Sequence, residues 1–226
     1  MTRITTPSRL HFGLFRLPSE QDGNLAVPAR HYGGVGLMID KPGVEVSIAP
    51  AKTWSAHGPL ADRALAYAQA FMSYNAEKES LAFAVTIERC APEHVGLGTG
   101  TQLGLAIAKA LAVALGHTEW DAALLARRVG RGQRSAIGVH GFQLGGFIVD
   151  GGKSAATTLA PLIARHEFPG AWGILLIVPK QLEGVHGIQE HEALAQLAKS
   201  TAPAGQTDAL CRLVLLGMLP ALVEQD

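Results

Sequence analysis

The stretch PEHVGLGTGTQ, residues 92–102, joins a strand pattern to a long helix pattern through three closely spaced glycines. Before it, residues 82–89 alternate in polarity, with Phe83, Val85 and Ile87 on one side, as in a half-buried strand. After it, an apolar run over residues 102–115 ends at Gly116, which is typical of a helix with a glycine C-cap. The stretch is therefore expected to lead a pliable backbone loop into the start of a helix.

Such a loop is suited to binding an anion. The free N–H groups at a helix start and the positive end of its dipole favour a phosphate or diphosphate. Threonine hydroxyls at positions 99 and 101 offer helix caps. The alternative is a plain helix cap reached by a flexible turn. The loop is neither a Walker loop nor a Gly-x-Gly-x-x-Gly loop. The candidate phosphate-binding residues here are Gly96, Gly98, Thr99, Gly100 and Thr101.

The rest of the chain mixes strand and helix patterns without strict alternation, which favours an α+β fold over a doubly wound sheet. A length of 226 residues allows one large domain or about one and a half ordinary ones. Strands are expected at residues 2–15, 44–49, 145–150 and 173–178, and helices at residues 62–75, 120–129, 190–199 and 208–219, the last ended by Pro220.

Composition excludes several classes of protein. The 19 basic and 19 acidic residues give no net charge, which argues against nucleic-acid binding. Hydrophobic residues make up 48% and charged residues 17%, which argues against disorder. Cys90 and Cys211 are too few for a disulfide framework and fit a cytoplasmic protein. The N-terminus has no signal-peptide pattern, and the apolar stretch at residues 103–115 is too short to span a bilayer, so no membrane partner is expected.

Four arginines fall within residues 127–134, and no Asp or Glu occurs from residue 122 to residue 149. Arginine is a planar, bidentate donor suited to phosphate and carboxylate. Arg127 and Arg128 are interpreted as the solvated end of the preceding helix, where cations are favoured. Arg131 and Arg134, which are interleaved with glycines, are the candidates for a second anion site.

Other side chains are weaker candidates. Strand alternation would put Arg9 and His11 on one face, where they could meet a carboxylate or a phosphate, or simply face solvent. His140 lies in a glycine-rich segment and could point toward the same site. Asp150 could bind Mg²⁺ or a ribose, although a turn with the following two glycines is favoured. No histidine or cysteine spacing indicates zinc, and the metal ligands stay unassigned.

The pattern Pro-x-x-x-Gly-Leu-Gly before a helix resembles the phosphate loop of the GHMP kinase superfamily, and the segment GGVG at residues 33–36 lies where that superfamily has its first motif. The resemblance implies a domain like the second domain of ribosomal protein S5, followed by a ferredoxin-like part. Two departures stand out: the kinase loop serines are replaced at positions 99–101, and Gly138 stands where many of these kinases have a catalytic Asp.

Five further segments closely resemble the β-ribofuranosylaminobenzene 5′-phosphate synthase branch of that superfamily: residues 8–14, 33–40, 130–138, 145–152 and 178–190. This resemblance implies an enzyme that joins 4-aminobenzoate or 4-hydroxybenzoate to 5-phosphoribosyl 1-diphosphate in methanopterin biosynthesis, releasing CO₂ and diphosphate, with Mg²⁺ as the expected cofactor. For this reaction we take Arg9, His11 and His140 as the catalytic candidates, and Ser135 joins the phosphate-binding set. The alternatives are an ATP-dependent GHMP kinase and a truncated, non-catalytic phosphate-binding homologue.

Members of the superfamily are usually longer than this chain. We therefore expect residues 1–155 to form the N-terminal domain and residues 156–226 an incomplete ferredoxin-like part. An incomplete sheet exposes an edge and apolar surface, so we also expect a homodimer.

Overall fold

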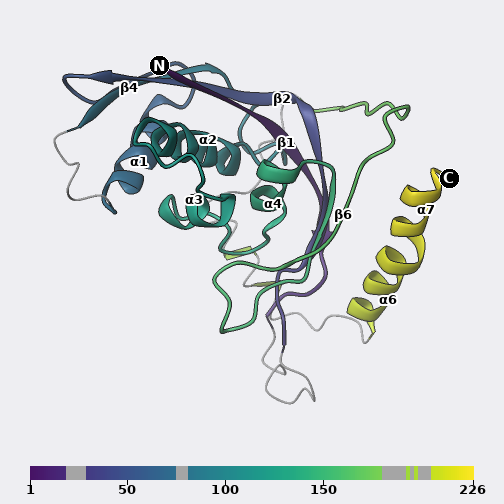
Figure 1. Cartoon of the computed structure of the whole chain (residues 1–226). Helices are drawn as coiled ribbons and strands as arrows, with labels where there is room; N and C mark the ends of the chain where they lie inside the picture. Colours follow the sequence, from purple (N-terminus) through teal and green to yellow (C-terminus); the bar gives the residue numbers. More distant parts are fainter. Residues whose placement is uncertain (19–28, 75–80, 180–191, 194–195, 198–204) are drawn as a thin grey trace.

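The protein is built on one six-stranded sheet with helices on both faces (Figure 1). The structure, a computed structural model, describes residues 1–18, 29–74, 81–179, 192–193, 196–197 and 205–226. Its elements are, in order, β1 (Thr2–Leu14), β2 (Gly34–Ala51), β3 (Ser55–His57), α1 (Ala61–Met72), β4 (Ala82–Arg89), α2 (Thr99–Ala114), α3 (Ala122–Arg128), α4 (Ile137–Leu144), β5 (Phe147–Asp150), β6 (Leu162–His166), α6 (Gln206–Leu213), the π-helical turn η3 (Val214–Met218) and α7 (Leu219–Glu224). Strands and helices are mixed, which confirms the α+β expectation.

The long strand β2 is the axis of the sheet. β1 pairs antiparallel along most of its length, while β4 and β5 pair with its two halves on the other side. The resulting order is β3-β4-β2-β5-β6, with β1 beside β2. The loop from β4 to α2 therefore begins where β1, β2 and β4 run together.

The main core lies between this sheet and the layer of helices α1 to α4 (Figure 1). Alternate residues of β2, namely Val44, Val46 and Ile48, turn inward and are at most 2% exposed. α2 is apolar almost all round and is buried along most of its length, as is typical of a central helix. This burial fixes the N-terminus of α2 firmly against the sheet.

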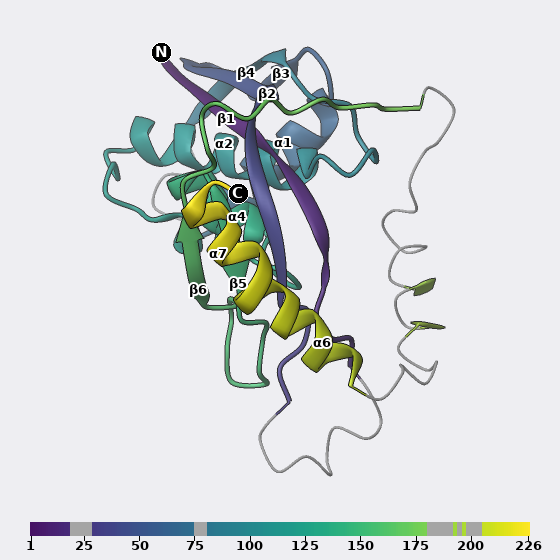
Figure 2. The same cartoon turned by 90° about the vertical axis from the view of Figure 1, so that its right-hand side faces the viewer.

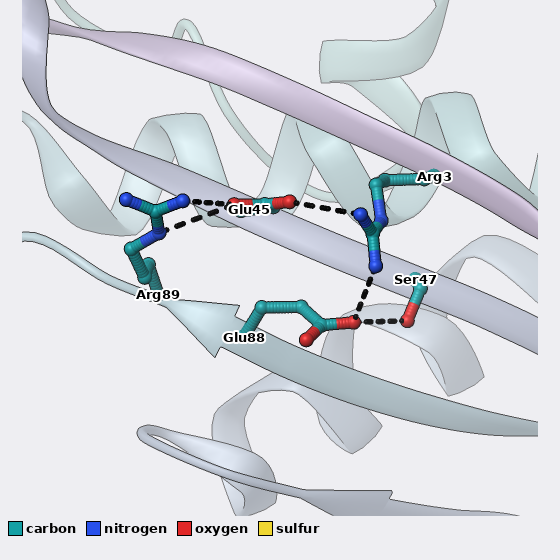
Figure 3. A network of polar contacts seen from close by, with 5 residues as sticks. All are labelled: Arg3, Glu45, Ser47, Glu88 and Arg89. Atoms are coloured by element: carbon teal, nitrogen blue, oxygen red, sulfur yellow. Dashed lines mark hydrogen bonds and ion pairs between the residues drawn. The ribbon is translucent and has the colours of Figure 1, made fainter.

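The opposite face of the sheet is divided between a polar network and a helix. The intervening residues Glu45 and Ser47 of β2 meet Arg3, Glu88 and Arg89 in a network of ion pairs and hydrogen bonds (Figure 3). Over the other half, the continuous helix from α6 to α7 crosses in front of β2 and β5 (Figure 2). Its buried side chains pack on a second apolar cluster of Val35, Leu37, Ile39, Phe147 and Val149.

By length and composition alone, this helix, Gln206–Glu224, could span a membrane, and it is the one such helix in the described part of the chain. Val214 and Leu222 nevertheless pack against the sheet. A single helix of this kind is weak grounds for a membrane span, because a helix that packs on protein passes the same test.

Several sequence expectations are confirmed. The strand at residues 82–89 is β4, and the helices expected at residues 62–75, 102–115 and 120–129 are α1, α2 and α3, with ends that differ by up to three residues. The strand expected at residues 145–150 is β5. The sequence patterns missed α4, β3 and β6. Of the helix expected at residues 190–199, only residues 192–193 and 196–197 are described, and these are helical; the other residues lie outside the described part of the chain.

Two expectations are wrong. Residues 173–178 form neither strand nor helix, and the side chains of Ile174, Leu175 and Ile177 are exposed, because the segment pairs with no described strand. Pro220 does not end the last helix, which continues to Glu224. The π-helical turn η3 comes immediately before it and places Pro220 in the first turn of α7, where a missing N–H is tolerated.

Candidate functional site

The glycine loop, defined here as residues 92–98, bends sharply into α2. Gly96 and Gly98 have φ values of +84° and +69°, a left-handed backbone that glycine adopts without strain, and Gly98 is the N-cap of α2. The expected threonine caps are wrong: no side chain caps α2, and the Thr99 hydroxyl instead donates to the carbonyl of Pro92, 2.8 Å away. Thr99 thus closes the loop on itself, and no side chain caps the first N–H groups of α2, among which that of Thr101 donates to the carbonyl of Gly98 (3.0 Å).

Arg9 on β1 runs along this loop. Its backbone N–H donates to the carbonyl of Leu97 (2.9 Å), which ties the strand to the loop. A Cβ placed on Gly98 would lie 3.1 Å from Nε of Arg9, and one placed on Gly138 would lie 3.6 Å from its Cδ. The Arg9 side chain therefore lies between the glycine loop and the start of α4.

The N-terminal turns of α2 and α4 meet at this point. Gln102 is fully buried, and its Nε2 donates to the carbonyl of Gly138 (2.8 Å). A Cβ on Gly138 would also lie 3.3 Å from the Thr101 side chain. Two helix dipoles consequently direct their positive ends toward one region, which favours an anion there.

A second group of residues beside the glycine loop was not predicted from the sequence. Arg63 of α1 forms an ion pair with Glu93 of the glycine loop, and its Nε donates to the Tyr67 hydroxyl (3.1 Å). The Tyr67 hydroxyl donates in turn to the carbonyl of Gly100 (3.0 Å). The i, i+4 spacing of Arg63 and Tyr67 on the expected helix, with Glu93 beside the loop glycines, is the only signal that sequence reasoning had for this group.

Arg131 joins the same group from the segment before α4. Its guanidinium lies over the Tyr67 ring, 4.9 Å from the centroid. Burial, with the nearby charges of Arg63 and Arg134, lowers the pKa of Arg131 to about 10. Arg131 is thus close enough to both Arg63 and Arg134 to feel their charges, and with Arg9 at the loop we call these four residues the arginine cluster.

Arg127 is a solvated residue at the helix end, as expected, whereas the expectation of a solvated Arg128 is wrong. Arg127 is exposed in the last turn of α3, whereas the Arg128 guanidinium stacks on the Trp120 ring at 4.2 Å. This cation–π contact anchors α3 to its neighbours. Of the arginine-rich segment, Arg131 lies over Tyr67, and Arg134 is near enough to Arg131 to lower its pKa.

His11 lies next to Arg9 on β1 but is uncharged near neutral pH. Burial, and to a lesser extent the charge of Arg9, lowers the pKa of His11 to about 4. Its Nδ1 accepts the N–H of Gly13 (3.2 Å), which leaves the ring proton on Nε2. The pair therefore brings one positive charge and one neutral hydrogen-bond donor.

His140 and Ser135 have partners of their own. An Nε2 contact of 2.8 Å joins His140 to the carbonyl of Ala160, and His140 lies two residues beyond Gly138 and so on the other side of α4. Ser135 donates to the buried carboxylate of Asp150 (2.8 Å), which also accepts the N–H of Gly152 (3.0 Å). The turn interpretation of Asp150 is confirmed, while burial raises the pKa of its carboxyl.

The comparisons with known proteins agree with this geometry. A family model described as GHMP kinases N terminal domain matches residues 62–146, which include the glycine loop and most of the arginine cluster. The "Beta-ribofuranosylphenol 5′-phosphate synthase" of Methanothermobacter thermautotrophicus is 33% identical over 245 residues, covering 99% of this chain and 71% of that protein. The protein of the same name from Archaeoglobus fulgidus is 34% identical, covering 100% of this chain and 72% of its own length. The chain belongs to the beta-ribofuranosylphenol 5′-phosphate synthase family.

Solved structures support the superfamily fold. A protein from Listeria monocytogenes that is described as a homoserine kinase superimposes on this chain with a TM-score of 0.59 at 17% identity. The match covers 100% of this chain and 70% of that one. The GHMP-type α+β domain is therefore shown, and the synthase family is a branch of that fold.

Mg²⁺ is the cofactor that the resemblance to this synthase family implies. Within the described residues, no three Asp, Glu, His or Cys side chains come together as a metal-binding group. The two carboxylates of this region are engaged, Glu93 by Arg63 and Asp150 by Ser135 and two backbone N–H groups. The described side chains therefore do not fit a Mg²⁺ ion held by the protein itself.

Proposed function

We propose that this chain transfers ribose 5-phosphate from 5-phosphoribosyl 1-diphosphate to 4-hydroxybenzoate or 4-aminobenzoate, with loss of CO₂. The observation that carries the proposal is the arginine cluster gathered around a glycine loop at two helix N-termini. A diphosphate leaving group and a 5′-phosphate need this density of bidentate donors. Because the relatives are named for a phenol product, we take 4-hydroxybenzoate as the first acceptor to test.

The step balances without a redox partner. The ring carbon that bears the carboxylate attacks the anomeric carbon, a carbon–carbon bond forms, and the bond to the diphosphate oxygen breaks. Loss of CO₂ then returns its bonding electron pair to the ring. Arg63, Arg131 and Arg134 of the arginine cluster stabilise the charge that develops on the leaving diphosphate. The loop residues Gly96, Gly98, Thr99, Gly100 and Thr101, with Ser135 behind them, form the proposed phosphate-binding backbone.

We assign Arg9 and the neutral His11 to the side of the benzoate acceptor. Arg9 supplies a positive charge for its carboxylate, and Nε2–H of His11 supplies a hydrogen bond that does not depend on pH near neutrality. We assign His140 a structural role rather than a direct contact with the acceptor, because its ring bonds the carbonyl of Ala160. Mg²⁺ is proposed to neutralise diphosphate charge as part of the bound substrate.

The kinase alternative requires an acidic residue beside Gly138. The three side chains nearest to the position of a Cβ there are Thr101, Gln102 and Arg9, none of them acidic. This surrounding favours ribosyl transfer over phosphoryl transfer, which needs a group to position the nucleophile.

The test is release of labelled CO₂ from carboxyl-labelled 4-hydroxybenzoate in the presence of 5-phosphoribosyl 1-diphosphate and Mg²⁺. We expect release from wild type, strong reduction in Arg134→Ala, and loss on addition of EDTA. Parallel assays with 4-aminobenzoate identify the acceptor. Formation of ADP from ATP with a small alcohol substrate, or folded protein that binds phosphate ligands without turnover, would support one of the alternatives instead.

We also propose that residues 156–226 belong to a ferredoxin-like part and that the protein works as a cytoplasmic homodimer. Support for the dimer comes from the exposed apolar side chains of residues 174–178 and of the last helix. Support for the compartment comes from Cys90 and Cys211, which are both free thiols.

A further inference from the structure

Arg63 lies against the first turn of α2. A Cβ placed on Gly100 would lie 2.9 Å from Cζ of Arg63, so a larger residue at position 100 would require the guanidinium to move from this place. The side chain thus sits on the helix N-terminus that the proposed diphosphate would approach.

Two aromatic contacts hold the guanidinium groups in place. The Tyr67 ring is almost fully buried, with Arg63 at 5.8 Å and Arg131 at 4.9 Å from its centroid. Its hydroxyl bridges Arg63 and the carbonyl of Gly100. Tyr67 therefore fixes two cations on one edge of the glycine loop, and the electrostatic cost of bringing them together is offset when an anion binds between them.

Glu93 is the carboxylate that pairs with Arg63. It binds Arg63 in the manner of a phosphate oxygen, because carboxylate and phosphate accept the same forked donor. The ion pair is reachable from solvent, with side chains 33% exposed for Arg63 and 23% for Glu93. A partly exposed pair of this kind is weak enough for a ligand of higher charge to displace.

We propose that Arg63 binds the diphosphate of the substrate and that Glu93 is its exchangeable counter-ion, which the diphosphate displaces. The inference rests on the function proposed above and adds to it one binding residue, Arg63, and one positioning residue, Tyr67. Exchange makes Glu93 a competitor of the ligand. It follows that removal of the Glu93 charge strengthens binding of diphosphate, whereas removal of the Arg63 charge weakens it.

The test is a calorimetric titration of the full chain with inorganic diphosphate. We expect Arg63→Gln to raise the dissociation constant at least about tenfold, as loss of a charge-assisted hydrogen bond does. Glu93→Gln lowers it about two- to fivefold, the strength of a partly exposed ion pair. Tyr67→Phe raises it, raises KM for 5-phosphoribosyl 1-diphosphate, and leaves KM for the benzoate unchanged.

The exposed ion pair of Arg3 and Glu88 provides matched controls (Figure 3). Arg3→Gln and Glu88→Gln make the same changes of charge away from the loop, and we expect them to leave diphosphate affinity within about twofold of wild type. Arg63→Lys, which keeps the charge but not the fork, is expected to fall between wild type and Arg63→Gln.

The outcomes separate this inference from the proposed function. An unchanged affinity in Arg63→Gln, or a Glu93→Gln variant that binds as poorly as Arg63→Gln, overturns the inference even if wild type releases CO₂. Wild type that binds diphosphate with the expected pattern but releases no CO₂ overturns the proposed function alone. Wild type that binds no diphosphate overturns both.

Discussion

The charge of His11 is set by its place on β1 rather than by its own chemistry. Burial lowers the pKa of His11 to about 4, and its Nδ1 accepts a hydrogen bond from the N–H of Gly13. A free histidine titrates near pH 6.5, so folding holds this ring neutral over a range in which it would otherwise be protonated. The neutral ring can donate and accept hydrogen bonds beside the positive charge of Arg9.

This shift predicts a pH dependence of stability. Between about pH 6.5 and pH 4 the unfolded chain binds a proton at His11 and the folded protein does not. The free energy of unfolding should therefore fall by up to about 3 kcal/mol as the pH drops through this range. Urea unfolding at several pH values should show a shallower decline in His11→Gln, and the exposed control His57→Gln should behave as wild type. Equal slopes in all three proteins would contradict the assignment.

Part of the site is predictable from local sequence. Arg9, Arg131 and Arg134 each lie in a distinctive segment, and the structure brings all three to the glycine loop region. Arg63 and Glu93 escape prediction, because they meet only when α1 packs beside the loop from β4 to α2. Contacts between distant segments leave no periodic signal in the sequence.

At the scale of elements, α4 shows why some helices escape detection. It contains Gly138 and Gly141, which lower helix propensity, yet both glycines are needed because α4 packs closely on its neighbours. A Cβ on Gly141 would run into the side chain of Met38 on β2. α2 and β4, in contrast, are predicted well because each carries a regular apolar period over its full length.

The same close approach makes a prediction for β2. A Cβ on Gly36 would lie 2.6 Å from Cγ2 of Ile137 and 2.6 Å from the backbone oxygen of Leu10. The backbone oxygen cannot yield, so Gly36→Ala should lower the free energy of unfolding by about 1–3 kcal/mol. Gly170→Ala, with nothing within 4 Å of the added carbon, should change it by less than about 0.5 kcal/mol. Denaturation midpoints that coincide for the two variants would argue against the tight packing of β2 on α4.

At the scale of the whole molecule, the last helix exposes several leucine side chains to solvent. Leu213, Leu215 and Leu216 are each more than half exposed, and the neighbouring segment exposes Leu175 and Ile177. Surface of this kind normally marks an interface. We expect sedimentation at micromolar concentration to give twice the chain mass of 23.7 kDa.

Leu216→Glu provides the control for this expectation. Its side chain is 67% exposed, so the substitution should shift the protein toward the monomer without lowering its thermal stability. A wild type that sediments as a monomer would contradict the proposed homodimer.

The arginine cluster also has a kinetic consequence. The chain has no net charge, yet Arg131 and Arg134 of this cluster lie in a stretch, residues 122–149, that contains no acidic side chain, so positive charge is concentrated in one part of the protein. Such a field draws polyanions to one face over distances comparable to the Debye length, about 8 Å at physiological ionic strength. The association rate constant for diphosphate should therefore decline steeply as salt is added, so that capture of the substrate depends on the ionic strength of the solution that surrounds the protein.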